Sequence, residues 1–293
     1  MRQKYLMSFI ICICMAFLLA GCGLTGFKEQ GTEGEVKVIP KDVELEVTFY
    51  NVGKADATLL RTKNSKVLID TGSADEAENL LEQLKEEGVE QIDVLLISHF
   101  DKDHVGGAAK ILENMQVKEI YTSYPCKESK EVSAYENALD EFEYIPQIVR
   151  ELYAFSLDGV VYTIYPPEKE EYERDTSNNS SLVVKATYKK KSFLFAGDIQ
   201  EDRIPELFQY DIRSDVLKVP HHGEKDPENK ELFAAVSPDY GIITSSDEEL
   251  EAEKVKKQLE KEGAAVYLTR KGRVKVWTDG KIIEISQEEE NES

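Results

Sequence analysis

The chain has 293 residues and a formal net charge of −21, from 57 acidic and 36 basic side chains. So large an acidic excess disfavours a surface that binds a long stretch of nucleic acid, because such binding depends on Lys and Arg side chains that neutralise the phosphates. It does not exclude a small phosphodiester in a pocket where a metal ion supplies the positive field.

The N-terminal segment reads as an export signal. Residues 1–21 begin with basic residues and continue as an apolar run that ends in Leu-Ala-Gly before Cys22. This order is typical of a signal peptide. Its ending resembles a bacterial lipobox, which implies cleavage before Cys22 and lipid attachment to the Cys22 thiol. An ordinary secretory signal or an uncleaved anchor are the alternatives. We therefore expect an exported protein, anchored by lipid on the outer face of the cell membrane.

The next segment, residues 22–42, is polar and contains glycines, as a flexible tether would. Beyond it, Cys126 is the one cysteine of the sequence. The predicted domain, residues 43–286, must therefore be stable without an internal disulfide. Residues 287–293 are acidic and are predicted to form a tail.

Strands and helices alternate along the predicted domain. Apolar and β-branched runs predict strands at 44–52, 56–62, 66–70, 92–98, 118–124, 160–167, 181–189, 191–197, 214–220, 239–245, 264–269, 272–278 and 281–286. Helical spacing of apolar or charged residues predicts helices at 75–88, 108–115, 127–150, 200–210, 230–236 and 248–262. Two βα halves favour an α/β fold, an αββα sandwich of two sheets. A single doubly wound sheet is the weaker alternative, because hairpin-like strand pairs occur in both halves.

The segment His99-Phe100-Asp101-Lys102-Asp103-His104 follows a strand predicted to be buried on both faces. A strand end that curls into a loop can direct its two histidines and two aspartates toward one point. Imidazole and carboxylate groups together suit Zn²⁺, Mn²⁺ or iron rather than a structural thiolate site. Gly106 and Gly107 allow the backbone to turn into the next helix. A charged surface turn is the alternative.

This segment resembles the H-x-[HD]-x-D-H signature of the metallo-β-lactamase superfamily. Further motifs narrow the resemblance to the hydrolase domain of ComEC-type competence proteins and their stand-alone relatives. In chain order these are NVGKADA (51–57), LIDTG (68–72), NNSSLVV (178–184), FAGD (195–198), PHHG (220–223) and WTDG (277–280). The resemblance spans the whole predicted domain and implies an αββα sandwich of the metallo-β-lactamase type.

The resemblance also implies a two-metal site, with Zn or Mn as the ions. His99 and Asp101 would bind one ion, and Asp103 and His104 the other. Asp198 would bridge both ions, and one or both of His221 and His222 would complete the coordination. If the PHHG histidine binds the same ion as His99 and Asp101, that ion has four protein ligands, counting Asp198. The other ion then has three, which are Asp103, His104 and Asp198. Two such ions about 3.5–4 Å apart hold and activate a hydroxide for attack at phosphorus, and Asp103 would steer it.

Other residues receive supporting roles. Asp70 would orient a ligand through a hydrogen bond, or serve as a structural turn carboxylate. Asn178 would face the pocket, or form a turn. Asp56 would orient a ligand in the same way, but is expected to be mainly structural. Lys225, just after PHHG, could meet an anionic substrate, but a solvated lysine is the favoured interpretation.

Three departures from the family pattern bear on the site. This chain has Lys54-Ala55 where relatives usually have Gln-Gly, and Glu224 where they have Ser. Relatives also tend to place a histidine after the strand at 239–245, but this chain has none there. Asp247 or Glu248 could supply an oxygen ligand instead, so the second metal position stays open.

The expected function is a surface-anchored, metal-dependent hydrolase that cleaves a phosphodiester, either a nucleic-acid fragment or a phosphoester of the cell envelope. One alternative is hydrolysis of β-lactams or of other amides or esters. A second is a non-catalytic binding or DNA-uptake lipoprotein that has kept the fold, and the absent histidine favours it.

Overall fold

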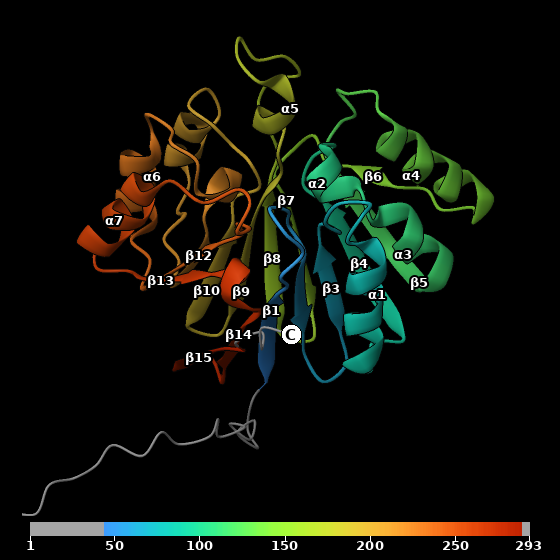
Figure 1. Ribbon diagram of the computed structural model, residues 1–293, viewed down its shortest axis with the longest axis horizontal. Helices are drawn as coiled ribbons and strands as arrows, with labels where there is room; N and C mark the ends of the chain where they lie inside the picture. Colours follow the sequence, from blue (N-terminus) through green and yellow to red (C-terminus); the bar gives the residue numbers. More distant parts are fainter. Residues whose placement is uncertain (1–43, 289–293) are drawn as a thin grey trace, which may run out of the picture. The chain divides into compact units, whose positions relative to one another are not determined.

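The computed structural model describes residues 44–288, which form two facing β-sheets with helices on both outer sides (Figure 1). The predicted signal, Cys22 and the tether lie outside these residues, as do residues 289–293 of the predicted tail. Gln287, which we expected in the tail, ends the last strand instead. Within residues 44–288, none of the helices combines the length and apolar character that a membrane crossing requires.

The first sheet has eight strands. In spatial order they are β15 (Ile283–Gln287), β14 (Val274–Thr278), β1 (Leu45–Phe49), β2 (Thr58–Arg61), β3 (Lys66–Ile69), β4 (Gln91–Ile97), β5 (Gln116–Thr122) and β6 (Gln147–Ile148). Pairing is antiparallel from β15 to β3 and parallel from β3 to β6. Each parallel connection contains a helix, because parallel neighbours need a crossover. These helices are α1 (Ala77–Glu86), α2 (Lys102–Val105) with α3 (Ala108–Asn114), and α4 (Lys130–Glu141).

The second sheet repeats this plan with seven strands. In spatial order they are β13 (Ala265–Leu268), β12 (Tyr240–Ile243), β11 (Val216–Lys218), β10 (Lys191–Phe195), β9 (Val183–Tyr188), β8 (Val160–Tyr165) and β7 (Tyr153–Leu157). It is antiparallel from β7 to β10 and parallel from β10 to β13. Its other elements are α5 (Thr176–Asn179), η1 (Ile204–Gln209), η2 (Pro220–Gly223), α6 (Asn229–Val236), α7 (Glu253–Lys261) and η3 (Thr269–Lys271).

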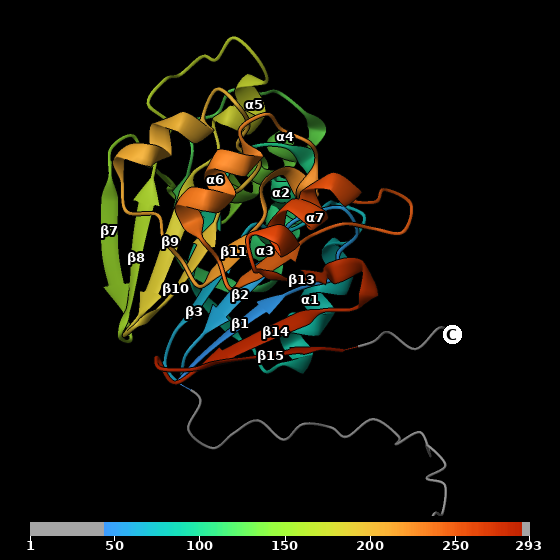
Figure 2. The same ribbon diagram turned by 90° about the vertical axis from the view of Figure 1, so that its left-hand side faces the viewer.

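Three apolar cores hold the four layers together. One fills the space between the first sheet and α1, α3 and α4, and includes Leu84 and Ile111. The second lies between the sheets, where the rings of Phe49 and Phe195 are 6.0 Å apart. The third joins the second sheet to η1, α6 and α7 and includes Leu259. This is the predicted αββα sandwich, and Figure 2 shows its strands from the side.

The local predictions differ from the structure in several places, and the short helices α2 and α5 were not predicted. The predicted helix at 200–210 is a 3-10 helix with a proline near its start. The region 127–150 holds the shorter helix α4 and then strand β6. Strand β7 was not predicted, and its side chains are half-buried or exposed because it lies at the edge of the second sheet. None of these differences touches the ends of β4, β10 and β11, from which the candidate site is built.

Candidate metal centre

The histidine and aspartate segment leaves the carboxyl end of β4 and enters α2. His99 and His104 are fully buried, and their ring centroids are 4.1 Å apart. The turn after α2 packs against another loop. A Cβ on Gly106 would lie 2.5 Å from the Ala74 backbone nitrogen, and one on Gly107 would lie 2.3 Å from the Thr71 carbonyl oxygen. These glycines are needed for close packing rather than for an unusual backbone angle.

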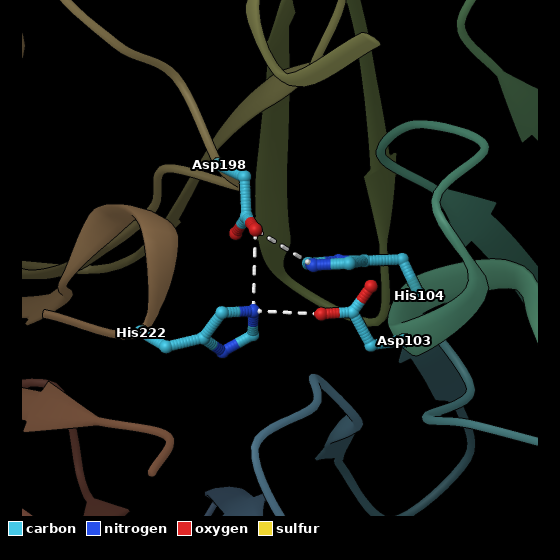
Figure 3. A group of neighbouring side chains, drawn as sticks. All are labelled: Asp103, His104, Asp198 and His222. Carbon is cyan, nitrogen blue, oxygen red and sulfur yellow. Dashed lines mark ion pairs between the residues drawn. The ribbon is translucent and has the colours of Figure 1, made fainter. Parts of the chain in front are cut away.

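Two further groups reach the same point from the second sheet. Asp198 follows β10, and His222 lies in the η2 turn that follows β11. One oxygen of Asp198, Oδ2, lies 3.2 Å from Nε2 of His104 and 3.2 Å from Nε2 of His222. Nε2 of His222 is also 3.1 Å from Oδ2 of Asp103. Figure 3 shows these four side chains pointing toward one another, and their ligand atoms all lie within 4.8 Å of one another. We call Asp103, His104, Asp198 and His222 the ligand cluster.

The ligand cluster fits a divalent metal ion. The Nε2 atoms of His99, His104 and His222 are buried and make no hydrogen bond of acceptable geometry. Buried polar atoms are rarely left without a partner, so these nitrogens, two of them beside the Asp198 carboxylate, call for an absent group. Nitrogen and carboxylate donors are those of Zn²⁺ and Mn²⁺ sites.

Charge in the metal-free cluster is balanced by protons. Burial alone would lower the pKa of His104, but the negative charges of Asp198 and Asp70 raise it well above its ordinary value. Burial also opposes the charge on His222, yet Asp198 and Asp103 raise its pKa to about 9. Burial, together with the nearby charge of His104, lowers the pKa of His99 to about 4. Because ligand histidines bind metals only as neutral rings, metal binding must displace the protons of His104 and His222.

In each histidine of the ligand cluster, the second ring nitrogen, Nδ1, contacts an oxygen atom outside the cluster. Nδ1 of His104 lies 2.9 Å from Oδ2 of Asp70, which also accepts a hydrogen bond from the Ser98 hydroxyl at 2.7 Å. Nδ1 of His222 lies 3.0 Å from the Thr244 carbonyl oxygen. Such contacts fix the ring orientation and favour Nε2 as the metal-binding atom. Asp70 thus occupies the position expected of an orienting residue.

The sequence reasoning missed Lys218, which lies directly behind Asp198. It ends strand β11 and is 2 % exposed. Its ammonium forms an ion pair with Oδ2 of Asp56 and lies 3.5 Å from Oδ1 of Asp198. Burial disfavours the charged lysine, but Asp56 and Asp198 raise its pKa. With Oδ1 facing the lysine, Asp198 offers only Oδ2 to the cluster. The sequence does contain a signal for this residue, because a lysine within an apolar strand just before PHHG indicates a buried charge near the site.

Asp56 is more closely tied to the site than expected. It is buried, accepts a 2.6 Å hydrogen bond from the Thr244 hydroxyl and pairs with Lys218. Its oxygens also lie 3.8 Å from Nδ1 of His104 and 3.6 Å from Nδ1 of His222. Asp56 therefore connects both cluster histidines to Lys218 and is more than a turn residue.

Three residues of the site have left-handed backbone conformations. Asp70, His221 and His222 have φ angles of 58°, 48° and 50°, in the left-handed region that side chains other than glycine seldom adopt. Such conformations persist only where surrounding contacts impose them, and they concentrate at functional sites. In the PHHG turn, the two strained residues direct the neighbouring imidazoles to different places.

Not all predicted ligands join the cluster. His221 is partly exposed, with Nδ1 at 3.1 Å from Nε2 of Gln200 and Nε2 at 3.4 Å from Nδ2 of Asn178. Asn178 is buried beside this histidine. The Asp101 carboxylate instead contacts the Ser177 hydroxyl and, at 2.7 Å, the Lys127 ammonium.

The arrangement reverses the expected ligand count. His222 lies with Asp103 and His104, so this position has four candidate ligands. A second ion would be left with His99, Asp101 and Asp198. Asp247 does not fill the place of the absent histidine, since it pairs with Arg270 at 2.9 Å. Neither Asp247 nor Glu248 belongs to the ligand cluster.

The three departures from the family pattern meet at the edge of the site. The Lys54 ammonium lies 2.5 Å from Oε1 of Glu224 and 3.1 Å from Oε2 of Glu249. Glu249 belongs to the segment that takes the place of the expected histidine. This segment is also tied to the PHHG turn, because the Ala252 amide donates to the Gly223 carbonyl oxygen. The ion pairs therefore join three loops beside His222.

Comparison with known proteins gives relatives among competence proteins. The chain is 26% identical over 223 residues to ComE operon protein 3 of Bacillus subtilis. The aligned region covers 69% of this chain and 28% of that protein. The chain is 27% identical over 246 residues to competence protein ComA of Neisseria gonorrhoeae, covering 80% and 33%. It is 28% identical over 206 residues to recombination protein 2 of Haemophilus influenzae, covering 68% and 24%. The chain thus spans a third or less of the length of these relatives.

Solved structures share the fold at low sequence identity. The β-hydroxylase CmlA superposes with a TM-score of 0.56 at 13% identity, covering 83% of this chain and 55% of that one. The metallo hydrolase Igni18 of Ignicoccus hospitalis gives a TM-score of 0.51 at 14% identity, covering 83% and 100%. Because a hydroxylase and a hydrolase share this fold, the fold alone does not decide the reaction.

The family model of the metallo-β-lactamase superfamily matches residues 50–245. This range begins in the loop after β1, contains the whole ligand cluster and ends just after β12. The match agrees with the resemblance found in the sequence motifs and with the two-sheet architecture. The chain therefore belongs to the metallo-β-lactamase superfamily and is related to ComEC-type competence proteins.

Proposed function

We propose that this protein is a metal-dependent phosphodiesterase. The observation that carries the proposal is the ligand cluster, in which buried imidazole nitrogens without hydrogen bonds surround Oδ2 of Asp198. A divalent ion bound there would activate a water molecule and stabilise negative charge developing at phosphorus. The relationship to competence proteins supports a phosphodiester over a β-lactam, although the shared region is only a part of those proteins.

The residues of the site have different proposed roles. His104, Asp198 and His222 are buried and would hold the ion, while Asp70 and the Thr244 carbonyl fix the two imidazoles. Asp103 is the most exposed member of the cluster, with a quarter of its side chain accessible. Its second carboxylate oxygen can therefore accept a hydrogen bond from the attacking water and orient it toward substrate. Zn²⁺ or Mn²⁺ suits this donor set.

Replacing Asp103 with alanine tests the proposal. We expect the wild-type protein with Zn²⁺ or Mn²⁺ to hydrolyse bis(p-nitrophenyl) phosphate, and Asp103→Ala to lose roughly 100- to 10,000-fold in rate, the range for a group that positions or accepts a proton. The rate is measured from nitrophenolate absorbance over a range of metal concentrations. Asp140→Ala is a matched control that should keep the wild-type rate, because Asp140 is an exposed residue of α4 outside the ligand cluster.

A second candidate function is a non-catalytic binding lipoprotein. The observation that favours it is the poor second metal position, where Asp101 is engaged by Lys127 and Ser177. If the wild-type protein hydrolyses no phosphodiester at saturating metal, and Asp103→Ala still functions in cells, this candidate replaces the first.

We also propose that the protein is lipid-anchored through Cys22 on the outer face of the cell membrane. The proposal rests on the basic and apolar leader that ends in Leu-Ala-Gly-Cys. Cys22→Ser is expected to move the protein from the membrane fraction to the soluble one. Mass spectrometry of the wild-type N-terminus should show the lipid. An unlipidated wild-type chain, together with a variant that stays on membranes, would disprove the anchor.

A further inference from the structure

A basic groove is lined by residues of α6, α7 and the segment before α6. These two helices lie on the outer side of the second sheet (Figures 1 and 2). Its volume is about 440 Å³. Five lysines and three acidic residues line it, an excess of positive charge in a chain whose acidic residues outnumber basic ones by 57 to 36. The lysines are Lys225, Lys230, Lys254, Lys257 and Lys261. We call this surface the lysine groove.

The spacing of the α7 lysines places them on one face of the helix. Lys254, Lys257 and Lys261 are three and four residues apart, the spacing that brings side chains onto one side of a helix. The helix rise puts Lys261 about 10 Å beyond Lys254. Val255 and Leu259 of α7 are buried and pack against the second sheet, and Val255 also lines the groove. The helix thus presents a row of positive charge to the groove.

Most of this charge is available to a ligand. Lys257 lies 3.3 Å from Glu253, and Lys230 lies 3.7 Å from Glu231. Within residues 44–288, no ion pair involves the other three groove lysines. The Asp226 carboxylate, also in the groove, is occupied by the backbone amides of Glu201 and Glu228 at 2.9 and 2.8 Å.

The groove is connected along the chain to the PHHG turn, which carries His222 of the ligand cluster. Lys225 lies three residues after His222, just beyond the PHHG turn. Asn229, which lines the groove, donates a 3.0 Å hydrogen bond from Nδ2 to the Glu224 carbonyl oxygen. The wall of the groove is therefore attached directly to the turn that carries a metal-binding candidate.

We propose that the lysine groove binds the flanking phosphates of a short polyanionic strand, a single-stranded nucleic-acid fragment, whose scissile phosphodiester lies at the ligand cluster. This deepens the proposed function, on which it rests for the position of the scissile bond. The groove is short and the rest of the molecule is acidic, so it accommodates only a few phosphates. A concave groove fits a strand better than it fits a flat anionic membrane.

The test uses Lys254→Gln, Lys257→Gln and Lys261→Gln combined in the full chain. Binding of a fluorescein-labelled oligothymidylate is followed by anisotropy in metal-free protein, so that the strand stays intact whether or not the protein hydrolyses it. The control combines Lys85→Gln, Lys190→Gln and Lys281→Gln, which make the same change in net charge. All three control lysines are exposed. Lys190 and Lys281 lie in hairpin turns, and Lys190 precedes β10 at the end opposite Asp198.

The groove variant is expected to bind the oligothymidylate on the order of tenfold more weakly at about 0.1 M salt. Each lost phosphate contact lowers the magnitude of the slope of log K against log salt by about 0.7, so the loss of three contacts should lower it by about 2. The control should show neither change. Equal weakening in both variants, or in neither, would overturn the proposal. So would a groove variant that loses only a preference for phosphatidylglycerol over phosphatidylcholine vesicles, which would indicate a membrane-binding surface. Absence of hydrolysis with metal would instead overturn the proposed function alone.

Discussion

His222→Ala is expected to lower metal affinity by more than roughly 100-fold, the upper end for residues that only orient ligands. Nε2 of His222 points at Asp198 and Asp103, and its loss removes one of four candidate ligands. His221→Ala should change metal affinity less than about tenfold, because His221 contacts Gln200 and Asn178 instead. The measurement is titration of metal-depleted protein with Zn²⁺, read by calorimetry.

The two adjacent histidines control for each other. Both residues have positive φ angles in the same turn, so alanine at either position disturbs the backbone similarly. Circular dichroism and the melting temperature of both metal-free variants show whether the fold is kept. If both variants lose metal binding equally, or His221→Ala loses more, then the turn does not direct the two side chains as described.

Lys218→Met is expected to destabilise the metal-free protein by roughly 3–5 kcal/mol, the range for removing one partner of a buried ion pair. The ammonium lies between Asp56 and Asp198, and all three groups are at most 5 % exposed. Without the lysine, Asp56 and Asp198 would lose the buried cation between them, and only the protonated imidazoles of His104 and His222 would offset their charge. The free energy of unfolding, from urea denaturation followed by circular dichroism, measures the effect.

The double variant Lys218→Met with Asp56→Asn separates charge from packing. It removes the positive charge together with the carboxylate that Lys218 contacts most closely, so it should recover much of the lost stability. The amide oxygen of Asn can still accept the hydrogen bond from Thr244. A loss below about 1 kcal/mol for Lys218→Met, an ordinary value for a substitution away from special features, would show that the pair is not a buried structural element.

Local patterns predicted the parts of the fold that depend on periodicity. The helix at 75–88 and the strand at 92–98 correspond to α1 and β4, because the apolar residues of one are spaced for a helix and those of the other form a continuous buried run. Edge strand β7 escaped prediction because an edge carries less apolar burial. The 3-10 form of η1 depends on its packing against the second sheet, which a local pattern does not contain.

The site shows the same division. His99, Asp103 and His104 could be identified because they follow one buried strand within six positions. Choosing between His221 and His222 required the backbone angles of the turn, which come from its contacts with other loops. Lys218 and Asp56 are far apart in the sequence, and only the pairing of the two sheets brings them together. The ion pairs of Lys54 with Glu224 and Glu249 likewise could not be predicted, because they depend on contacts among three loops that are distant in the sequence.

Return of metal to the metal-depleted protein tests the central claim most directly. Zn²⁺ or Mn²⁺ is added in steps, bound metal is counted by mass spectrometry, and hydrolysis of bis(p-nitrophenyl) phosphate is followed at each step. We predict no hydrolysis without metal, a first ion bound tightly by the ligand cluster, and activity that rises further as a weaker second position fills. Full occupancy of the cluster without hydrolysis of the phosphodiester would contradict the proposed function, and failure to bind any metal would contradict the metal centre itself.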